Sequence, residues 1–71
     1  MDVGDKVVLK TEKIREIKDP YVRSMYAGEG IITHNFCSGY FSVRFENKKT
    51  GDCLNGGAYG SDLIVVAKHV S

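Results

Sequence analysis

The sequence of 71 residues contains no tryptophan, one proline and two cysteines, and it has no long apolar run. Its longest apolar run, residues 63–67 (LIVVA), is far shorter than a membrane-spanning helix. The first ten residues mix acidic side chains and lysines with valines, unlike the continuous apolar core of a secretory signal. These absences predict a cytoplasmic protein without a membrane association, in which both cysteines remain thiols.

An excess of either charge is also missing. Ten lysines and arginines face nine acidic residues, and the formal net charge is +1. No basic tail or arm therefore provides the electrostatic footprint that is typical of nucleic-acid binding. A chain of this length has room for one domain with a thin core, so a large buried active site is not expected.

Sequence motifs of catalysis and of phosphate binding are absent as well. Residues 28–30 (GEG) lack the third glycine and the helix start of a dinucleotide-binding loop, and no lysine followed by serine or threonine completes a phosphate loop. No serine, histidine and carboxylate constellation is present. His34 and Cys37 stand three apart on a strand that enters a turn, where their side chains diverge. We therefore expect no enzymatic activity and no cofactor.

Four soft metal ligands are nevertheless spread over residues 34–69. They follow the order H-x2-C, fifteen residues, C, fifteen residues, H. Tetrahedral zinc accepts such ligands, but the C-x-x-C knuckle of most structural zinc sites is missing. A zinc-binding or thiol-active domain is thus a remote alternative to free thiols. The four candidates are His34, Cys37, Cys53 and His69.

Alternation of apolar and polar residues predicts five short strands. It is clearest in residues 40–47, where Phe41, Val43 and Phe45 must point inward because the residues between them are polar or charged. The expected strands are residues 5–10, 29–36, 40–47, 52–54 and 63–68.

The same alternation assigns faces to the first two strands. Val7 and Leu9 share one face of the first, and Ile32, His34 and Phe36 share one face of the second. Glycine, asparagine and serine mark the connections. Turns are expected at residues 37–39, 47–51, 55–57 and 58–62.

A short helix is expected between Asp19 and Gly28. Asp19 can cap it, and Pro20 suits its first position. Gly28 stands where a glycine in the left-handed conformation commonly ends a helix. Gly30 then lets the backbone bend into the second strand. For the preceding residues 11–18, a helical turn and a loop fit equally well.

Four segments resemble parts of the Src-homology-3-like (SH3-like) small β-barrels. Residues 3–7 (VGDKV) look like the opening of many such domains, and residues 28–32 (GEGII) look like the glycine-led second strand of KOW-type barrels. Residues 41–45 (FSVRF) are similar to their third strand, and residues 62–66 (DLIVV) to their D-L-x-x-V ending. The long connection between the first and second strands and the one-turn connection before the last strand also match this superfamily.

The resemblance implies a mostly β fold, a single five-stranded SH3-like barrel over residues 1–71 with a short helix or helical turn between its first two strands. It also implies a noncatalytic module, because such barrels bind RNA or DNA, peptides or partner domains. The chain departs from the nucleic-acid-binding members in lacking surplus lysine and arginine. It lacks the two tryptophans or the acidic excursion of the eukaryotic peptide-binding members.

Two candidate binding surfaces follow. Aromatic side chains around one shallow groove would form a ligand platform, or else cap a small core; the candidates are Tyr21, Tyr26, Phe36, Tyr40 and Tyr59. Cationic side chains would contact phosphates if folding gathers them and turns the interleaved acids away; these are Lys10, Lys13, Arg44 and Lys48.

The sequence therefore predicts a small non-enzymatic binding module of a bacterial or phage accessory type. Another protein is the favoured partner because the charge is balanced, and nucleic acid is the alternative. No oligomeric state is predicted.

Overall fold

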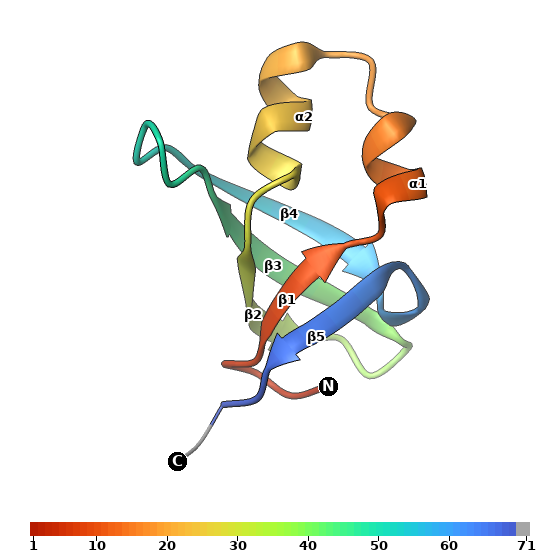
Figure 1. The fold of residues 1–71 in the computed structure, drawn as a ribbon. Coiled ribbons are helices and arrows are strands. Elements are labelled where there is room, and N and C mark those ends of the chain that lie inside the picture. The colour runs from red at the N-terminus through yellow and green to blue at the C-terminus, as the bar shows by residue number, and fades with distance from the viewer. Residues whose placement is uncertain (70–71) are drawn as a thin grey trace.

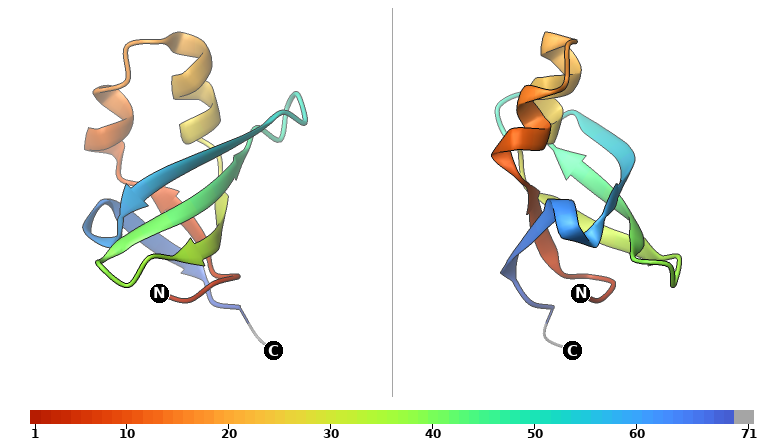
Figure 2. Two further views of the ribbon diagram at one scale, coloured as in Figure 1. Left: turned by 180° about the vertical axis from the view of Figure 1, so that it is seen from behind. Right: turned by 90° about the vertical axis from the view of Figure 1, so that its right-hand side faces the viewer.

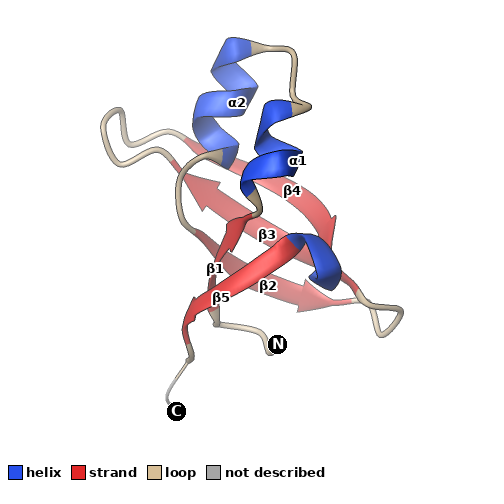
Figure 3. Cartoon of the chain, turned by 45° about the vertical axis from the view of Figure 1, so that its right-hand side comes forward, coloured by secondary structure: helices blue, strands red, loops and turns tan. Residues whose placement is uncertain are grey.

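The computed structural model describes residues 1–69 and consists mostly of β-structure, as predicted (Figure 3). All paired strands are antiparallel. In chain order the elements are β1 (Lys6–Leu9), α1 (Thr11–Arg15), α2 (Pro20–Tyr26), β2 (Gly30–Asn35), β3 (Tyr40–Glu46), β4 (Cys53–Tyr59), the 3-10 helix η1 (Gly60–Asp62) and β5 (Leu63–Ala67).

The five strands form one sheet in the order β4-β3-β2-β1-β5 (Figure 1). The sheet curls, so that β5 and β4 lie on opposite sides of the core (Figure 2). Within residues 1–69, these two end strands are not paired with each other, so the sheet is open. The two helices lie at one end of the molecule, and the N-terminus lies at the other (Figure 1).

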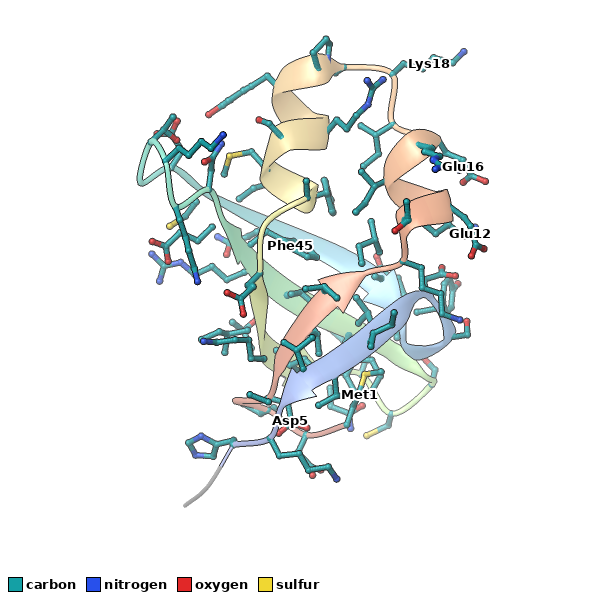
Figure 4. All side chains as sticks on the ribbon, viewed as in Figure 1. Met1, Asp5, Glu12, Glu16, Lys18 and Phe45 are labelled. Carbon is teal, nitrogen blue, oxygen red and sulfur yellow. The ribbon has the colours of Figure 1, made fainter. Side chains whose placement is uncertain are left out.

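The core fills the concave side of this sheet. Phe45, Val43 and Ile32 are almost completely buried, and Phe45 points into the interior in Figure 4. Val7 and Leu9 of β1 are buried as well, so the predicted inward faces of the first and third strands are confirmed. The whole cluster comprises Val7, Leu9, Ile32, Phe41, Val43, Phe45, Ala58 and Leu63.

Two short helices fill the connection between β1 and β2. Residues 11–15, for which the sequence left helix and loop open, are helical as α1. The predicted helix is α2, in which Pro20 takes the first turn and the Asp19 carboxylate accepts a hydrogen bond of 2.9 Å from the backbone N–H of Tyr21. Such a cap satisfies a backbone donor that has no partner within the helix.

Gly28 follows α2, but its predicted role was wrong. Its φ is not in the left-handed region, and Ala27 ends the helix with an αR conformation. Gly28 is instead pressed against the backbone, where a Cβ atom would collide with the carbonyl oxygen of Glu46. The position therefore has no room for a side chain, because the chain leaving α2 passes directly over the end of β3.

The strand β4 is longer than predicted. Residues 55–57, expected to form a tight turn, lie inside it, and the strand continues to Tyr59. Its two central glycines make room for tyrosines on both faces, because a Cβ on Gly56 would strike Tyr26 and a Cβ on Gly57 would strike Tyr40. Packing across the sheet, not turn formation, explains these glycines.

The strand β2 contains an irregularity that changes the faces of its second half. Ile32 is paired with Val43, but the next pair joins His34 to Ser42, so that Thr33 is an extra residue. Ile32 is buried, whereas His34 and Phe36 are exposed. The prediction that these three share one face was wrong, because this β-bulge shifts the alternation by one residue.

Candidate functional site

Four aromatic side chains form a row on the outer face of the sheet, the face opposite the core. The ring centroids of His34 and Phe36 lie 4.5 Å apart, those of Phe36 and Tyr40 5.9 Å, and those of Tyr40 and Tyr59 4.9 Å. Each ring lies tilted or edge-on to its neighbour, within the range of favourable aromatic contacts. We call these four residues the aromatic strip.

Strand pairing brings the strip together. Tyr40 opens β3 directly opposite Tyr59 at the end of β4, and both alternate with buried residues, so their rings point outward. The bulge in β2 turns His34 and Phe36 to the same side, and the backbone N–H of Phe36 donates to the carbonyl of Tyr40 over 3.1 Å. The strip therefore stands on hydrogen-bonded strands that position the rings.

The turn between β2 and β3 carries local backbone strain. Cys37 has a φ of 65°, in the left-handed region that glycine and asparagine tolerate best. Its backbone N–H donates to the side-chain oxygen of Asn35 over 2.8 Å, which holds the turn. This turn fixes the spacing between Phe36 and Tyr40.

A shallow hollow of about 280 Å³ adjoins the strip. Gly56 and Gly57 of β4 line it, and the outer end of the Tyr40 ring lies over Gly57. Polar side chains edge it on the other side. The full lining is Phe36, Tyr40, Ser42, Asn55, Gly56 and Gly57. An aromatic wall beside hydrogen-bonding groups suits a ligand that carries both apolar and polar atoms.

The five predicted platform residues do not form one surface. Phe36, Tyr40 and Tyr59 belong to the strip, but Tyr26 lies on the core side of the sheet with its ring centroid 4.7 Å from that of Phe45. Tyr21 lies on α2, where its hydroxyl donates to Asp52 over 3.4 Å. Tyr26 thus caps the core, which is the alternative that the sequence left open.

His34 was missed as a member of the strip. The sequence presents it two residues before Phe36, which is the spacing of side chains on one strand face. That spacing was recognised, but the face was assigned to the core. The bulge at Thr33 decides that His34 lies on the outer face of the sheet. No glycine or other residue pattern in the sequence indicates this bulge.

A second hollow, of about 390 Å³, lies between the helices and the end of β4. Tyr26, Tyr40 and Tyr59 all line it, next to Lys13 and Asp62. It is therefore more aromatic than basic, and a carboxylate stands at its rim. That carboxylate disfavours a phosphate group here, because like charges repel.

The four predicted phosphate contacts are divided between two parts of the molecule. Lys10 and Lys13 lie at the start of α1, and Lys13 forms an ion pair of 3.6 Å with Glu16. Arg44 and Lys48 line another hollow, of about 410 Å³, on the outer face beside β2. Folding therefore does not gather the four into one basic patch.

Glu29 neutralises much of the charge in the hollow beside Arg44. Its carboxylate accepts a hydrogen bond from Lys48 and lies 3.9 Å from the ammonium of Lys6. The Lys48 contact lowers the pKa of Glu29 and raises the pKa of Lys48. Arg44, in contrast, donates to Cys53 Sγ over 3.5 Å and has no carboxylate within 4 Å among residues 1–69.

The four candidate zinc ligands lie at separate places. His34 is in the strip, Cys37 is in the turn, Cys53 contacts Arg44, and His69 packs beside Gly4. Both cysteines are exposed and form no disulfide. Within the described part of the chain, no group of three or more histidine, cysteine or acidic side chains could hold a metal ion.

Comparisons of the chain with protein-family models, with curated proteins and with solved structures gave no match. Over residues 1–69, no helix has the length and apolar character needed to cross a membrane.

Proposed function

We propose that this protein is a non-enzymatic binding module that engages another protein through the aromatic strip. The observation that carries the proposal is the row of four adjoining rings on an exposed sheet face. Phe36 and Tyr59 are each more than half exposed. Large apolar rings held open to solvent are typical of the residues that dominate the energetics of protein interfaces.

Two further features favour a peptide chain as the ligand. The rings stand on paired strands, so their ordering costs little entropy when a ligand binds. The hollow beside them presents Ser42 and Asn55, whose side chains can bond to peptide N–H and C=O groups. The balanced net charge of +1 does not favour a polyanion.

We also infer that the curled sheet is a variant of the SH3-like barrel with KOW-like features. Support comes from the strand order, from the long excursion through α1 and α2 after β1, and from the single turn of η1 directly before β5. Cytoplasmic location and bacterial or phage origin stay predictions from the sequence.

Nucleic-acid binding is the second candidate, and one observation favours it. Arg44 lies on the same outer face as the strip and has no carboxylate within 4 Å among residues 1–69. Exposed aromatic rings stack on unpaired bases, and a neighbouring arginine can contact phosphate. One such arginine gives weak affinity with a shallow salt dependence.

A random peptide library displayed on phage tests the first proposal. We expect the protein to enrich related peptides, and the double variant Phe36→Ala/Tyr59→Ala to bind them at least about tenfold more weakly, since hot-spot rings contribute 2 kcal/mol or more. Tyr21→Ala is the matched control, because Tyr21 is 53% exposed but lies outside the strip.

Thermal unfolding of each variant checks that its fold is retained. Equal binding by the double variant and the wild type would refute the strip as the site. Fluorescence anisotropy with labelled single-stranded oligonucleotides at low salt tests the alternative. Binding that falls with added salt and is lost in Arg44→Ala would replace a protein partner by nucleic acid.

A further inference from the structure

The strand β5 forms one end of the sheet, and β1 is its one strand partner in the described part of the chain (Figure 1). It reads LIVVA, without proline and without charge. Ile64 and Val66 are 48% and 49% exposed on it. Natural end strands usually carry charges or proline that prevent pairing with another chain, and β5 carries neither.

The backbone of β5 has hydrogen-bonding groups at its outer edge. The backbone N–H of Lys10, which directly follows β1, donates to the backbone carbonyl of Asp62 over 2.9 Å. The backbone polar groups of Asp62 therefore point toward β1. In an antiparallel strand the backbone N–H and C=O groups of alternate residues point toward a given neighbouring strand. Those of Ile64 therefore also point toward β1, and those of Val65 point away from it. The N–H and C=O of Val65 therefore lie at the outer edge, as does the C=O of Leu63, whose N–H is bonded to Gly60.

We propose that β5 pairs with β5 of a second copy of this chain, antiparallel and about a two-fold axis at Val65. In this arrangement Val65 of each copy exchanges both backbone hydrogen bonds with the partner's Val65. Ile64 then lies opposite the partner's Val66, and this contact occurs twice because the interface is symmetric.

The charges that flank β5 agree with this register. Asp62 precedes the strand and Lys68 follows it, each three residues from Val65. Continued beyond the regular pairs, this register brings each Asp62 close to the partner's Lys68. A two-fold axis at Ile64 or Val66 would separate Asp62 from the partner's Lys68. It would also centre the pairing on a residue whose backbone N–H and C=O do not point to the free edge of β5.

The dimer is expected to be weak. The pairing of β5 with β1 is irregular beside Val66, because Val7 pairs with Val65 and Lys6 pairs with Ala67. This irregularity limits the regular part of the new pairing to a few residues. Such an interface lies well below the area of a stable complex, so we expect a dissociation constant of about 1 mM.

Concentration-dependent amide NMR spectra of the whole chain test this inference, together with sedimentation velocity. Between about 0.05 and about 2 mM, a range around that dissociation constant, the amide signals of residues 62–68 should shift and the average mass should rise. Constant spectra over this range would overturn the inference. Shifts confined to the aromatic strip would also overturn it.

Variants distinguish this register from other modes of association. Ile64→Lys should remove the concentration dependence, because the new charge meets the partner's Val66. Ile31→Lys is the matched control, since Ile31 is 45% exposed but lies on β2, which is paired on both sides. An unchanged response in Ile64→Lys would refute pairing through β5.

Charge reversal gives a second check. Asp62→Lys and Lys68→Asp should each weaken the dimer at least about tenfold, because each places like charges opposite one another, and the double reversal should restore it. Failure of the double variant to recover, while its thermal unfolding is unchanged, would contradict the proposed register. None of these outcomes depends on peptide binding by the strip.

Discussion

Asp5 is a charged side chain with only 2% of its surface exposed. Its two carboxylate oxygens accept hydrogen bonds from the backbone N–H groups of His69, over 2.8 Å, and Asp2, over 2.9 Å. Figure 4 shows it beneath β1, where the start of the chain meets the segment after β5. It thus connects two distant parts of the chain, and both oxygens are used in this structural role rather than in catalysis.

These bonds make folding depend on pH. The N–H groups of His69 and Asp2 lower the pKa of Asp5 below its ordinary value of 3.8. A lowered folded-state pKa gives stability that is present above the unfolded-state value and lost as the pH falls through the folded-state value. We predict that Asp5→Asn lowers the midpoint of thermal unfolding at pH 7, and that the difference from the wild type shrinks below about pH 4.

Thermal unfolding followed by circular dichroism between about pH 2 and about pH 7 measures this difference. Asp2→Asn is the matched control, because it makes the same chemical change and keeps the backbone N–H that bonds to Asp5. An Asp5→Asn deficit that is the same at every pH would show that the carboxylate charge is not involved.

Gly57 and Gly28 both lack room for a Cβ, but for different reasons. At Gly57 the obstacle is the outer end of the Tyr40 ring, which can rotate away, whereas at Gly28 it is the backbone carbonyl of Glu46. We predict that Gly57→Ala changes the unfolding free energy by no more than about 1 kcal/mol but separates Tyr40 from Tyr59. Gly28→Ala should cost more than about 2 kcal/mol, because backbone must move.

Ring-current shifts of the tyrosine protons report the position of Tyr40, and urea unfolding reports stability. If Gly57→Ala leaves these proton shifts unchanged, Tyr40 does not lie over Gly57. Peptide binding by Gly57→Ala should weaken when the Tyr40–Tyr59 contact is lost. Because the unfolding free energy changes little, this loss of binding would reflect the geometry of the strip and not the stability of the fold.

At the scale of elements, the strands that the sequence predicted best are those with uninterrupted alternation. In β3 three buried apolar residues alternate with polar ones, and the structure has this alternation without irregularity. The faces of β2 were predicted as far as Ile32 and no further, because a bulge depends on pairing with another strand. In β4 a pair of glycines was read as a turn, although contacts with tyrosines from α2 and β3 require them.

The bulge in β2 leads to a prediction about deletion. Thr33 is the unpaired residue, and its removal would leave strict alternation with Ile32 inward, His34 outward and Phe36 outward. We predict that the deletion variant folds and keeps the ring contacts of the strip. Its cost should be about 1 kcal/mol, including the exposed hydrogen bond from Thr33 Oγ1 to the Ser42 carbonyl.

Deletion of Ser42 provides the contrast. It removes a residue paired with His34, so either Phe41 or Val43 must leave the core face. This variant should lose cooperative unfolding. Circular dichroism and the aromatic region of the proton NMR spectrum compare the two deletions. If deletion of Thr33 is as damaging as deletion of Ser42, the bulge is required for folding and does not merely set the faces of the strip.

At the scale of the whole molecule, the sequence predicted five strands closed into a barrel, whereas the five-stranded sheet of residues 1–69 is open. Closure depends on how near β4 comes to β5, which is set by the curl of all five strands together. The site is limited in the same way. Its rings come from three strands, and a local pattern does not state which residues of different strands become neighbours. Tyr21, which lies on α2, and Tyr26, which packs on Phe45, were therefore grouped with the rings of the strip.

A single thin core also means that one buried ring carries much of the stability. A chain of this size is expected to have an unfolding free energy of about 4 to 10 kcal/mol. Phe45 is fully buried, contacts Tyr26 and lies among the other core residues, so Phe45→Ala should cost about 3 to 5 kcal/mol and leave the fold marginal or lost. Phe36→Ala, which removes the same ring from the exposed strip, loses only the contacts with His34 and Tyr40 and should cost about 1 kcal/mol. Thermal unfolding of both variants compares the two faces of the sheet directly, and equal losses would mean that the strip is part of the core rather than a surface available to a partner.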